Sequence, residues 1–312
     1  MLKRTRIALL FGVALAITLI ISACGSSTTT GNGTTSGGGS TPTTLGTPGS
    51  YNCIQGSITA SGSTALAPLV KAVATQYSSK CSGATITVNL GGSKTGLANV
   101  EAGSVDIGDS DIPAASTQSD LVDHQVAVVV FGIIVNKDVT LTNITTAQLK
   151  QIYSGQVKNW SALGGPNLPI VVVSRPASSG TRATFQKYIL GGPETVSGPS
   201  SLTTDSTGTV VTEVGQTNGS IGYAATGPVQ GNSSVTLLSI DGVAPTSANT
   251  QSNTYKFWNI EHMYTKGQPK PLAQALIDYM ASSDAKAIES MQAFVAITDM
   301  SPAAITAHNA VS

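Results

Sequence analysis

Four short segments of the chain combine hydroxyl side chains, glycines and a few charges in a pattern that suits anion binding. They are Ser61-Gly62-Ser63-Thr64, residues 91–96 (GGSKTG), Asp109-Ser110-Asp111 and residues 175–181 (RPASSGT). Three of them come just before a predicted helix, where unpaired backbone N–H groups and the positive end of the helix dipole favour an anion. A Ser or Thr before a helix is more often only an N-cap. The recurrence of the pattern, together with an arginine and an aspartate, nevertheless favours a binding site.

Two charged residues narrow the chemistry of this site. Arg175 offers a planar fork of N–H donors that matches two oxygens of a tetrahedral oxyanion. A surface ion pair is its alternative role, and Arg182 suits either role equally. Asp111 is more selective, because an ionised carboxylate only accepts hydrogen bonds and so favours an anion that still carries a proton. Phosphate keeps such a proton near neutral pH and sulfate does not, although Asp111 could instead cap a helix beginning near Pro113.

The elements that position these residues alternate between strands and helices. Strands are predicted over residues 56–60, 85–90, 105–108, 170–174 and 220–224, and the run 125–136 is either two strands or one strand that crosses between lobes. Helices are predicted over residues 64–79, 146–153, 181–190, 271–280 and 284–291, with a short one ending at Val100. This alternation predicts an α/β fold with largely parallel sheets, in which ligands bind at the carboxyl ends of strands.

The N-terminal region is typical of an exported protein. Lys3, Arg4 and Arg6 precede a 15-residue apolar run over residues 7–21, which is too short to span a membrane and indicates a signal segment over residues 1–23. The sequence before Cys24 resembles a bacterial lipobox, so Cys24 is expected to be the lipidation site; a plain anchor helix is the alternative. Residues 24–50 are rich in Gly, Ser, Thr and Pro and predict a flexible tether.

Cysteine usage agrees with an oxidising compartment. After Cys24 is assigned to the lipid, Cys53 and Cys81 remain and predict one disulfide, with two buried thiols as the alternative. The remaining body of the chain, residues 51–312, exceeds the usual size of one core and predicts two lobes.

Charge and motif content exclude several classes of protein. Removing the signal segment leaves 13 basic and 16 acidic residues, a net charge of 13 − 16 = −3, which argues against a nucleic-acid partner. His124, His262 and His308 have no metal-ligand spacing, and no GxSxG motif is present. We therefore expect neither an enzyme, nor a metal site, nor a cofactor.

Several longer motifs carry a family resemblance. Residues 55–298 resemble the phosphate-binding proteins of phosphate ABC transporters, through SGSTALAPLV, GGSKTGLANVEAGSVDIGDSDI, TTAQLKQIYSGQVKNWSALGG, LPIVVVSRPASSGTRATF and NGSIGYA. The resemblance implies a two-lobed, type II periplasmic-binding-protein-like fold with the ligand cleft between the lobes. Lobe one is expected over residues 51–128 plus 255–312 and lobe two over 129–254, with crossings near residues 128–132 and 255–259.

The resemblance also implies a ligand set and partners. Residues at motif positions that bind phosphate in that family are Thr64, Ser93, Asp111, Arg175, Ser179, Gly180 and Thr181, with Ser63, Ser110 and Arg182 as possible additional contacts. The implied partners are inorganic phosphate and the permease and ATPase subunits of an importer. The expected protein is a monomer, lipid-anchored on the outer face of the cell membrane.

One residue departs from the family pattern. The family usually has an acidic residue two positions before the serine of its SGT motif, and this chain has Ala177 there. We expect the change to alter the affinity or the phosphate–arsenate preference without abolishing binding. It also leaves sulfate, tungstate or molybdate open as the ligand. A surface lipoprotein without a transport role is the alternative from another class.

Overall fold

The computed structural model describes residues 45–46, 51–196, 201–204 and 206–311. The chain divides into two compact units, Met1–Thr41 and Pro42–Ser312, and every described residue belongs to the second. The predicted signal segment 1–23, Cys24 and most of the tether 24–50 lie outside the described residues, so these assignments stay predictions. Among the described residues, no helix is both long enough and apolar enough to cross a bilayer.

The first lobe is built on a mixed sheet. Its strands are β3 (Gly56–Gly62), β4 (Ala84–Leu90), β5 (Ile107–Ser110), β12 (Trp258–Lys266), β13 (Phe294–Val295) and the first part of β6 (Leu121–Asn136). β3 lies between β4 and β5, and all three run parallel. β12 pairs antiparallel with both β5 and β6. Next to this sheet, β1 (Leu45–Gly46) and β2 (Asn52–Cys53) form a separate two-stranded sheet.

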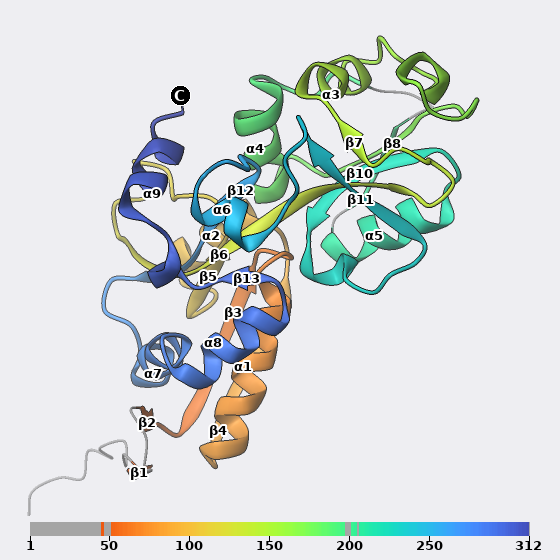
Figure 1. Cartoon of the computed structure of the whole chain (residues 1–312). Coiled ribbons are helices and arrows are strands. Elements are labelled where there is room, and N and C mark those ends of the chain that lie inside the picture. The colour runs from red at the N-terminus through yellow and green to blue at the C-terminus, as the bar shows by residue number, and fades with distance from the viewer. Residues whose placement is uncertain (1–44, 47–50, 197–200, 205, 312) are drawn as a thin grey trace, which may run out of the picture. The chain divides into compact units, whose positions relative to one another are not determined.

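Helices cover both faces of this sheet. They are α1 (Ala67–Lys80), α2 (Ser93–Glu101), α7 (Pro271–Met280) and α8 (Ser283–Met291). α1 buries Leu69 and Val73 in the main core and packs against α7 and α8. α2 contributes Leu97 and Val100 to a separate apolar cluster with Tyr264, on the other face of the sheet. The first lobe is therefore a three-layer arrangement, seen in the lower half of Figure 1.

The second lobe has its own sheet, which shares β6 with the first. Its further strands are β7 (Asn143–Ile144), β8 (Val171–Ser174), β9 (Ser201–Thr203), β10 (Ser220–Ala225) and β11 (Val235–Ile240). Its helices are α3 (Thr146–Tyr153), α4 (Gly180–Phe185), α5 (Thr207–Gln216) and α6 (Ser247–Gln251), with single turns η1 (Trp160–Leu163), η2 (Gln186–Leu190) and η3 (Gly227–Val229). β8 runs parallel to β9 and β10, whereas β10 and β11 are antiparallel to β6.

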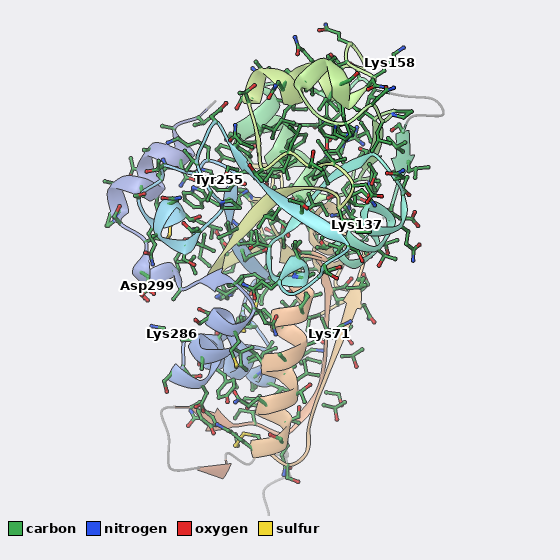
Figure 2. All side chains as sticks on the ribbon, turned by 45° about the vertical axis from the view of Figure 1, so that its right-hand side comes forward. Lys71, Lys137, Lys158, Tyr255, Lys286 and Asp299 are labelled. Atoms are coloured by element: carbon green, nitrogen blue, oxygen red, sulfur yellow. A yellow bond between two sulfur atoms is a disulfide. The ribbon has the colours of Figure 1, made fainter. Side chains whose placement is uncertain are left out.

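Two neighbouring segments join the lobes. Along β6, Val130 pairs with Trp258 of β12, while the next residue, Phe131, pairs with Ala225 of β10. The backbone N–H of Phe131 donates to Phe257 O at 3.0 Å, and the hydroxyl of Tyr255 (labelled in Figure 2) donates to Phe131 O at 2.8 Å. The crossing segments are thus held side by side, and β6 extends through both sheets (Figure 1). The lobe boundaries drawn from the sequence remain a prediction.

The C-terminal part of the chain reaches this junction. It contains η4 (Ile297–Asp299) and α9 (Pro302–Asn309). His308 of α9 is fully buried and stacks on Trp258 and on Tyr188, with ring centroids 3.7 Å and 3.8 Å away. Burial lowers the pKa of His308 to about 3, so its ring is neutral and packs as an apolar group.

The α/β class and the two lobes are confirmed, but the expectation of largely parallel sheets is wrong at the centre. The parallel strands flank antiparallel pairs made by β6, β10 and β12. The run predicted as one or two strands is a single strand of 16 residues. β12 was not predicted, because Asn259, Glu261, His262 and Thr265 interrupt its apolar pattern although all four are buried.

The predicted disulfide is confirmed and generates a stability prediction. Cys53 and Cys81 are bonded across a separation of 28 residues and join β2 to the end of α1. Replacing both by Ser should lower the free energy of unfolding by about 3.5 kcal/mol, because the bridge restricts the unfolded chain. Urea unfolding of the oxidised protein, the reduced protein and the Cys53→Ser/Cys81→Ser variant measures this. Equal midpoints for the oxidised protein and the variant would contradict it.

Candidate functional site

The turn after β3 places two hydroxyls at the boundary between the lobes. Ser63 Oγ accepts from the N–H groups of Ala65 and Leu66, at 3.1 Å and 2.9 Å, and donates to Asp111 Oδ1. Thr64 Oγ1 accepts from Arg175 Nη2 at 2.9 Å and from the N–H of Thr207 at 3.1 Å. Ser63 therefore forms its hydrogen bonds within the first lobe, whereas Thr64 forms hydrogen bonds to residues of the second lobe.

The glycine-rich turn before α2 brings backbone from both lobes together. Gly92 has a φ of 82°, a conformation that favours glycine, and it directly precedes Ser93 at the start of the helix. Ser93 Oγ accepts from the N–H of Asp111 at 2.9 Å. The N–H of Lys94 donates to Ser178 O at 3.1 Å, which links this turn to the loop before α4.

Asp111 lies where these segments meet. Its carboxylate accepts from Ser63 on one oxygen and from Thr181 Oγ1 on the other, the latter at 2.9 Å, and the residue is 2% exposed. Its carbonyl accepts from Asn259 Nδ2 at 2.7 Å. The alternative role of Asp111 as a helix cap is wrong, since residues 112–120 form turns and no helix.

The second lobe contributes the arginine and the start of α4. Arg175 is 1% exposed, and its carbonyl accepts from Arg182 Nη1 at 2.6 Å. Ser179 caps α4, because its Oγ accepts from the N–H of Arg182 at 3.2 Å. Gly180 lies so close to the first lobe that a Cβ there would be 2.2 Å from Ser93 Oγ. Only glycine fits at this contact.

Two of the possible additional contacts have local partners instead. Ser110 Oγ donates to Ile112 O at 2.6 Å and accepts from the N–H of the same residue at 3.1 Å, which stabilises the turn after β5. The guanidinium of Arg182 lies 3.7 Å from Glu194 Oε2 in addition to its bond to the Arg175 carbonyl. Ser63, the third, bonds directly to Asp111.

The structure adds residues that the sequence analysis did not select. Thr207 opens α5, is 1% exposed, and has its Oγ1 3.1 Å from Thr64 Oγ1. The sequence Ser206-Thr207-Gly208-Thr209 repeats the hydroxyl–glycine pattern of the other turns, so this signal was present in the sequence. Glu194 accepts from Ser174 Oγ and from the hydroxyl of Tyr223. Nothing in the spacing of Glu194 marked it.

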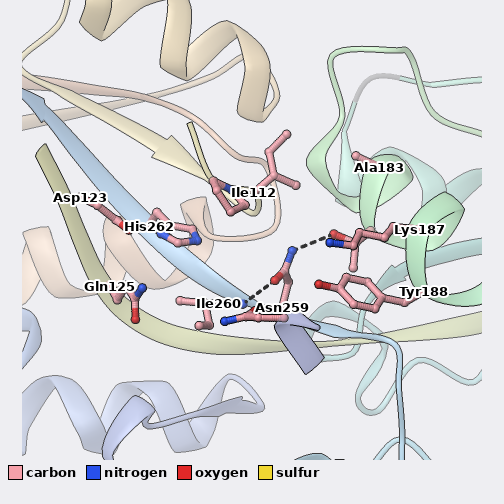
Figure 3. Close-up of a pocket in the computed structure, with 12 residues that line it drawn as sticks. Ile112, Asp123, Gln125, Ala183, Lys187, Tyr188, Asn259, Ile260 and His262 are labelled. Atoms are coloured by element: carbon pink, nitrogen blue, oxygen red, sulfur yellow. Dashed lines mark hydrogen bonds and ion pairs between the residues drawn. The ribbon is translucent and has the colours of Figure 1, made fainter. Parts of the chain in front are cut away.

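A pocket of about 480 Å³ adjoins this group of residues. It is lined by residues of both lobes, among them Ile112, His262, Lys187 and Tyr188, and Figure 3 shows them facing it. Asn259 lines the pocket and donates to Thr184 Oγ1 at 3.2 Å as well as to the Asp111 carbonyl. It thus links both lobes behind Asp111.

Two buried carboxyl groups near Asp111, those of Asp109 and Glu261, have raised pKa values. Burial, and next the charge of Asp111, raises the pKa of Asp109 to about 7. The same two causes raise the pKa of Glu261 well above its usual range. Within the ranges that the structure describes, no group of three or more His, Cys, Asp or Glu side chains is arranged to hold a metal ion. The site combines hydroxyl and guanidinium donors with one carboxylate acceptor, which suits a protonated oxyanion.

Comparisons with known proteins agree with the family resemblance. The PBP superfamily domain matches residues 28–284. The phosphate-binding protein PstS of Bacillus subtilis is 44% identical over 250 residues, which cover 78% of this chain and 82% of that protein. A phosphate ABC transporter substrate-binding protein of Clostridium perfringens, solved with bound phosphate, is 28% identical with a TM-score of 0.73, covering 78% of this chain and 100% of that chain. An ABC-type phosphate transport receptor of Vibrio cholerae is 27% identical with a TM-score of 0.63, covering 76% and 99%.

The matched residues 28–284 include most of the described part of the chain. The two-lobed periplasmic-binding-protein fold expected from the motifs is confirmed. The chain therefore belongs to the PBP superfamily and, within it, to the family of phosphate-binding proteins that includes PstS of Bacillus subtilis.

Proposed function

We propose that this protein captures inorganic phosphate between its lobes and delivers it to the permease and ATPase subunits of an ABC importer. The observation that carries the proposal is the buried Asp111 carboxylate among donors from both lobes. The named activities of the relatives from Bacillus subtilis and Clostridium perfringens support it. Binding without catalysis is part of the proposal.

The proposed ligand set is the one expected from the motifs. It consists of Thr64, Ser93, Asp111, Arg175, Ser179, Gly180 and Thr181, with Ser63 as a further contact. The hydroxyls and the guanidinium would donate to three phosphate oxygens, and Asp111 would accept from the P–OH. The local partners of Ser110 and Arg182 favour supporting roles for these two residues.

Ligand capture would couple to movement of the lobes. Thr64 and Asp111 come from the first lobe, whereas Arg175 and Thr181 come from the second, so only a closed arrangement offers phosphate both sets of groups. A ligand that binds the closed state better shifts the population toward it. We propose that the importer recognises this closed state of a monomer, with the lobe boundaries given above.

We also propose that the protein is extracytoplasmic and held to the membrane by a lipid on Cys24. The supporting features are the charged and apolar segment before Cys24 and the Cys53–Cys81 disulfide, which is typical of an oxidising compartment.

The first prediction from this proposal concerns ligand selectivity. Calorimetric titration at pH 7 and pH 8.5 should give one-to-one binding of phosphate and no heat from sulfate or tungstate. Arsenate should also bind, and its affinity relative to that of phosphate measures the effect of Ala177. Asp111→Asn should weaken phosphate binding about 10- to 100-fold, because a charge-assisted hydrogen bond is lost. The variant should also begin to bind sulfate, since an amide can donate. Sulfate binding by the unchanged protein with no response to phosphate would overturn the choice of ligand.

A second prediction concerns closure. In Gly180→Ala the new methyl group would overlap Ser93 Oγ and lie 2.8 Å from Asp111 Cβ. Because overpacking costs about 1–3 kcal/mol, phosphate affinity should fall about tenfold or more. Gly208→Ala is the matched control, since it adds a Cβ to the first turn of α5 with nothing within 4 Å. Equal phosphate affinities for the two variants, measured by calorimetry, would argue against this contact in the bound state.

The third prediction concerns the anchor. Cells expressing the full chain and fed labelled palmitate should incorporate the label, and mass spectrometry should find a chain that begins at Cys24. Cys24→Ala should abolish the label, because it removes the acylated sulfur. Cys81→Ser is the control cysteine variant and should still be labelled. An unlabelled wild-type chain that begins at Met1 would refute lipidation.

A further inference from the structure

The middle strand β12 contains polar side chains that the binding site described above does not use. Asn259 bonds to Asp111 and Thr184, and His262 Nδ1 lies 2.7 Å from Asp123 Oδ1. Glu261, between them in sequence, is fully buried. In the part of the chain that the structure describes, no hydrogen-bond donor reaches either of its oxygens. A carboxyl in such a position needs an explanation.

The register of the sheet places Glu261 beside Asp111. β12 and β5 are antiparallel, with His262 opposite Ser110 and Met263 opposite Asp109. β5 ends at Ser110, and continuing its register by one residue brings Glu261 next to Asp111. Residues directly opposite each other project from the same face of the sheet with Cβ atoms about 4.5–5.5 Å apart. Glu261 is fully buried beside Asp111, and the charge of Asp111 acts on its carboxyl.

Asp109 adds a third carboxyl to this face. It lies two residues before Asp111, so both side chains project to the same side of β5. It is fully buried, and no donor among the described residues reaches its oxygens. Asp111 differs from both neighbours, because the hydroxyls of Ser63 and Thr181 donate to its two oxygens.

This difference determines where the negative charge lies. Three adjacent buried carboxyls cannot all ionise, and hydrogen-bond donors favour the charged form of the group that they reach. Asp111 has such donors, so it carries the charge. Asp109 and Glu261 have none, and the raised pKa values of both mean that they keep their protons to a higher pH than an ordinary carboxyl does.

We propose that Glu261 is a positioning residue. Its protonated carboxyl donates a hydrogen bond to the Asp111 carboxylate and holds Asp111 as the single charged acceptor for the ligand. Asp109 is the second neutral carboxyl. The inference rests on the proposed role of Asp111 in phosphate binding. Glu261 itself would not contact the ligand. It would keep the negative charge of the site at one, which an anion can approach through its own P–OH.

Other ionisable groups around Glu261 do not replace this interaction. The two charges that act on it are those of Asp111 and Asp109 on β5. On the other elements packed against β12, the ionisable groups are Asp123 and His124 of β6, the exposed Lys94 and Glu101 of α2, and the buried His308 of α9, which stacks on Trp258. Asp123 pairs with His262, and His124 bonds to Thr265.

The proposal implies a pH dependence with a definite sign. Asp109 loses its proton as the pH rises through about 7, and burial also raises the pKa of Glu261 well above its usual range. Each loss adds a negative charge beside Asp111 and weakens anion binding. Conversely, a bound anion stabilises the neutral form of Asp109, so binding near pH 7.5 should draw a proton into the protein.

The test compares four variants of the full-length chain, purified in detergent and titrated with inorganic phosphate between pH 6.5 and pH 9. Glu261→Gln keeps a neutral donor, so its affinity at pH 6.5 should stay within about threefold of wild type and its loss at high pH should be smaller. Glu261→Leu removes the donor and should bind about tenfold more weakly at every pH. Asp109→Asn should reduce the proton uptake measured in two buffers of different ionisation enthalpy.

Glu289→Gln is the matched control. Glu289 of α8 is also buried, with a pKa raised to about 7, but α8 packs against α1, α7 and β13, and the charges that act on Glu261 are those of Asp111 and Asp109. Its variant should follow the wild-type pH profile. Because the phosphate ion titrates equally in all samples, ratios between variants and wild type remove its contribution.

The outcomes separate this inference from the proposed function. Equal affinities of Glu261→Gln and Glu261→Leu at every pH, or a shift in Glu289→Gln as large as that in Glu261→Gln, would overturn the positioning role. If Glu261→Leu does not fold, the profiles of Glu261→Gln and Asp109→Asn decide. Wild-type affinity and unchanged sulfate exclusion in Asp111→Asn would instead show that Asp111 is not a ligand, which is a failure of the proposed function.

Discussion

Placing the negative charge of Asp111 in the interior is the constraint on which the rest of the site depends. A buried carboxylate is tolerated only when donors surround it. Those donors come from separate segments, Ser63 after β3 and Thr181 in α4. Ser93 Oγ accepts from the backbone N–H of Asp111. Because Thr181 belongs to the other lobe, the charge is fully satisfied only when the lobes meet. In the proposed function, ligand recognition and closure would therefore have the same physical origin.

The crossing strands make this meeting reproducible. β6 takes part in both sheets, and β12 begins at the junction, where Trp258 pairs with Val130 of β6. Asn259, at the start of β12, donates to the Asp111 carbonyl and to Thr184 of α4, so one side chain at the junction contacts both walls of the site. The aromatic residues Tyr255, Phe257 and Trp258 bury the same region. A stiff junction of this kind limits the lobes to a hinge movement over short segments.

The sequence predicted the parts of this arrangement whose residue types follow ordinary folding patterns. It missed the parts where polar residues are buried. The turns with Ser, Thr and Gly were found, and the structure brings Thr64, Ser93, Asp111 and Thr181 together through them. β12 was missed, because the alternating pattern that predicts a strand places its polar residues on the solvent side. In β12, Glu261 and Asn259 are polar but buried next to the site. Glu194 depends on long-range contacts, which local propensity does not encode, whereas the hydroxyl–glycine pattern at Thr207 was present in the sequence but was not selected. The regular elements followed local rules, and the exceptions lie next to the site.

The arrangement also explains why a negatively charged residue can serve an anion-binding protein. If Asp109 and Glu261 were ionised, three charges would face the ligand, and no set of hydroxyls and one guanidinium would compensate for the repulsion. Burial raises the pKa of both neighbours, which favours their neutral forms and makes the proposed site sensitive to alkaline conditions. In the proposed site, the charge of Asp111 would then admit only an anion that carries a proton, since sulfate has no proton to donate to it. On this proposal, selectivity would depend on Asp109 and Glu261, which do not contact the ligand, as much as on the residues that do.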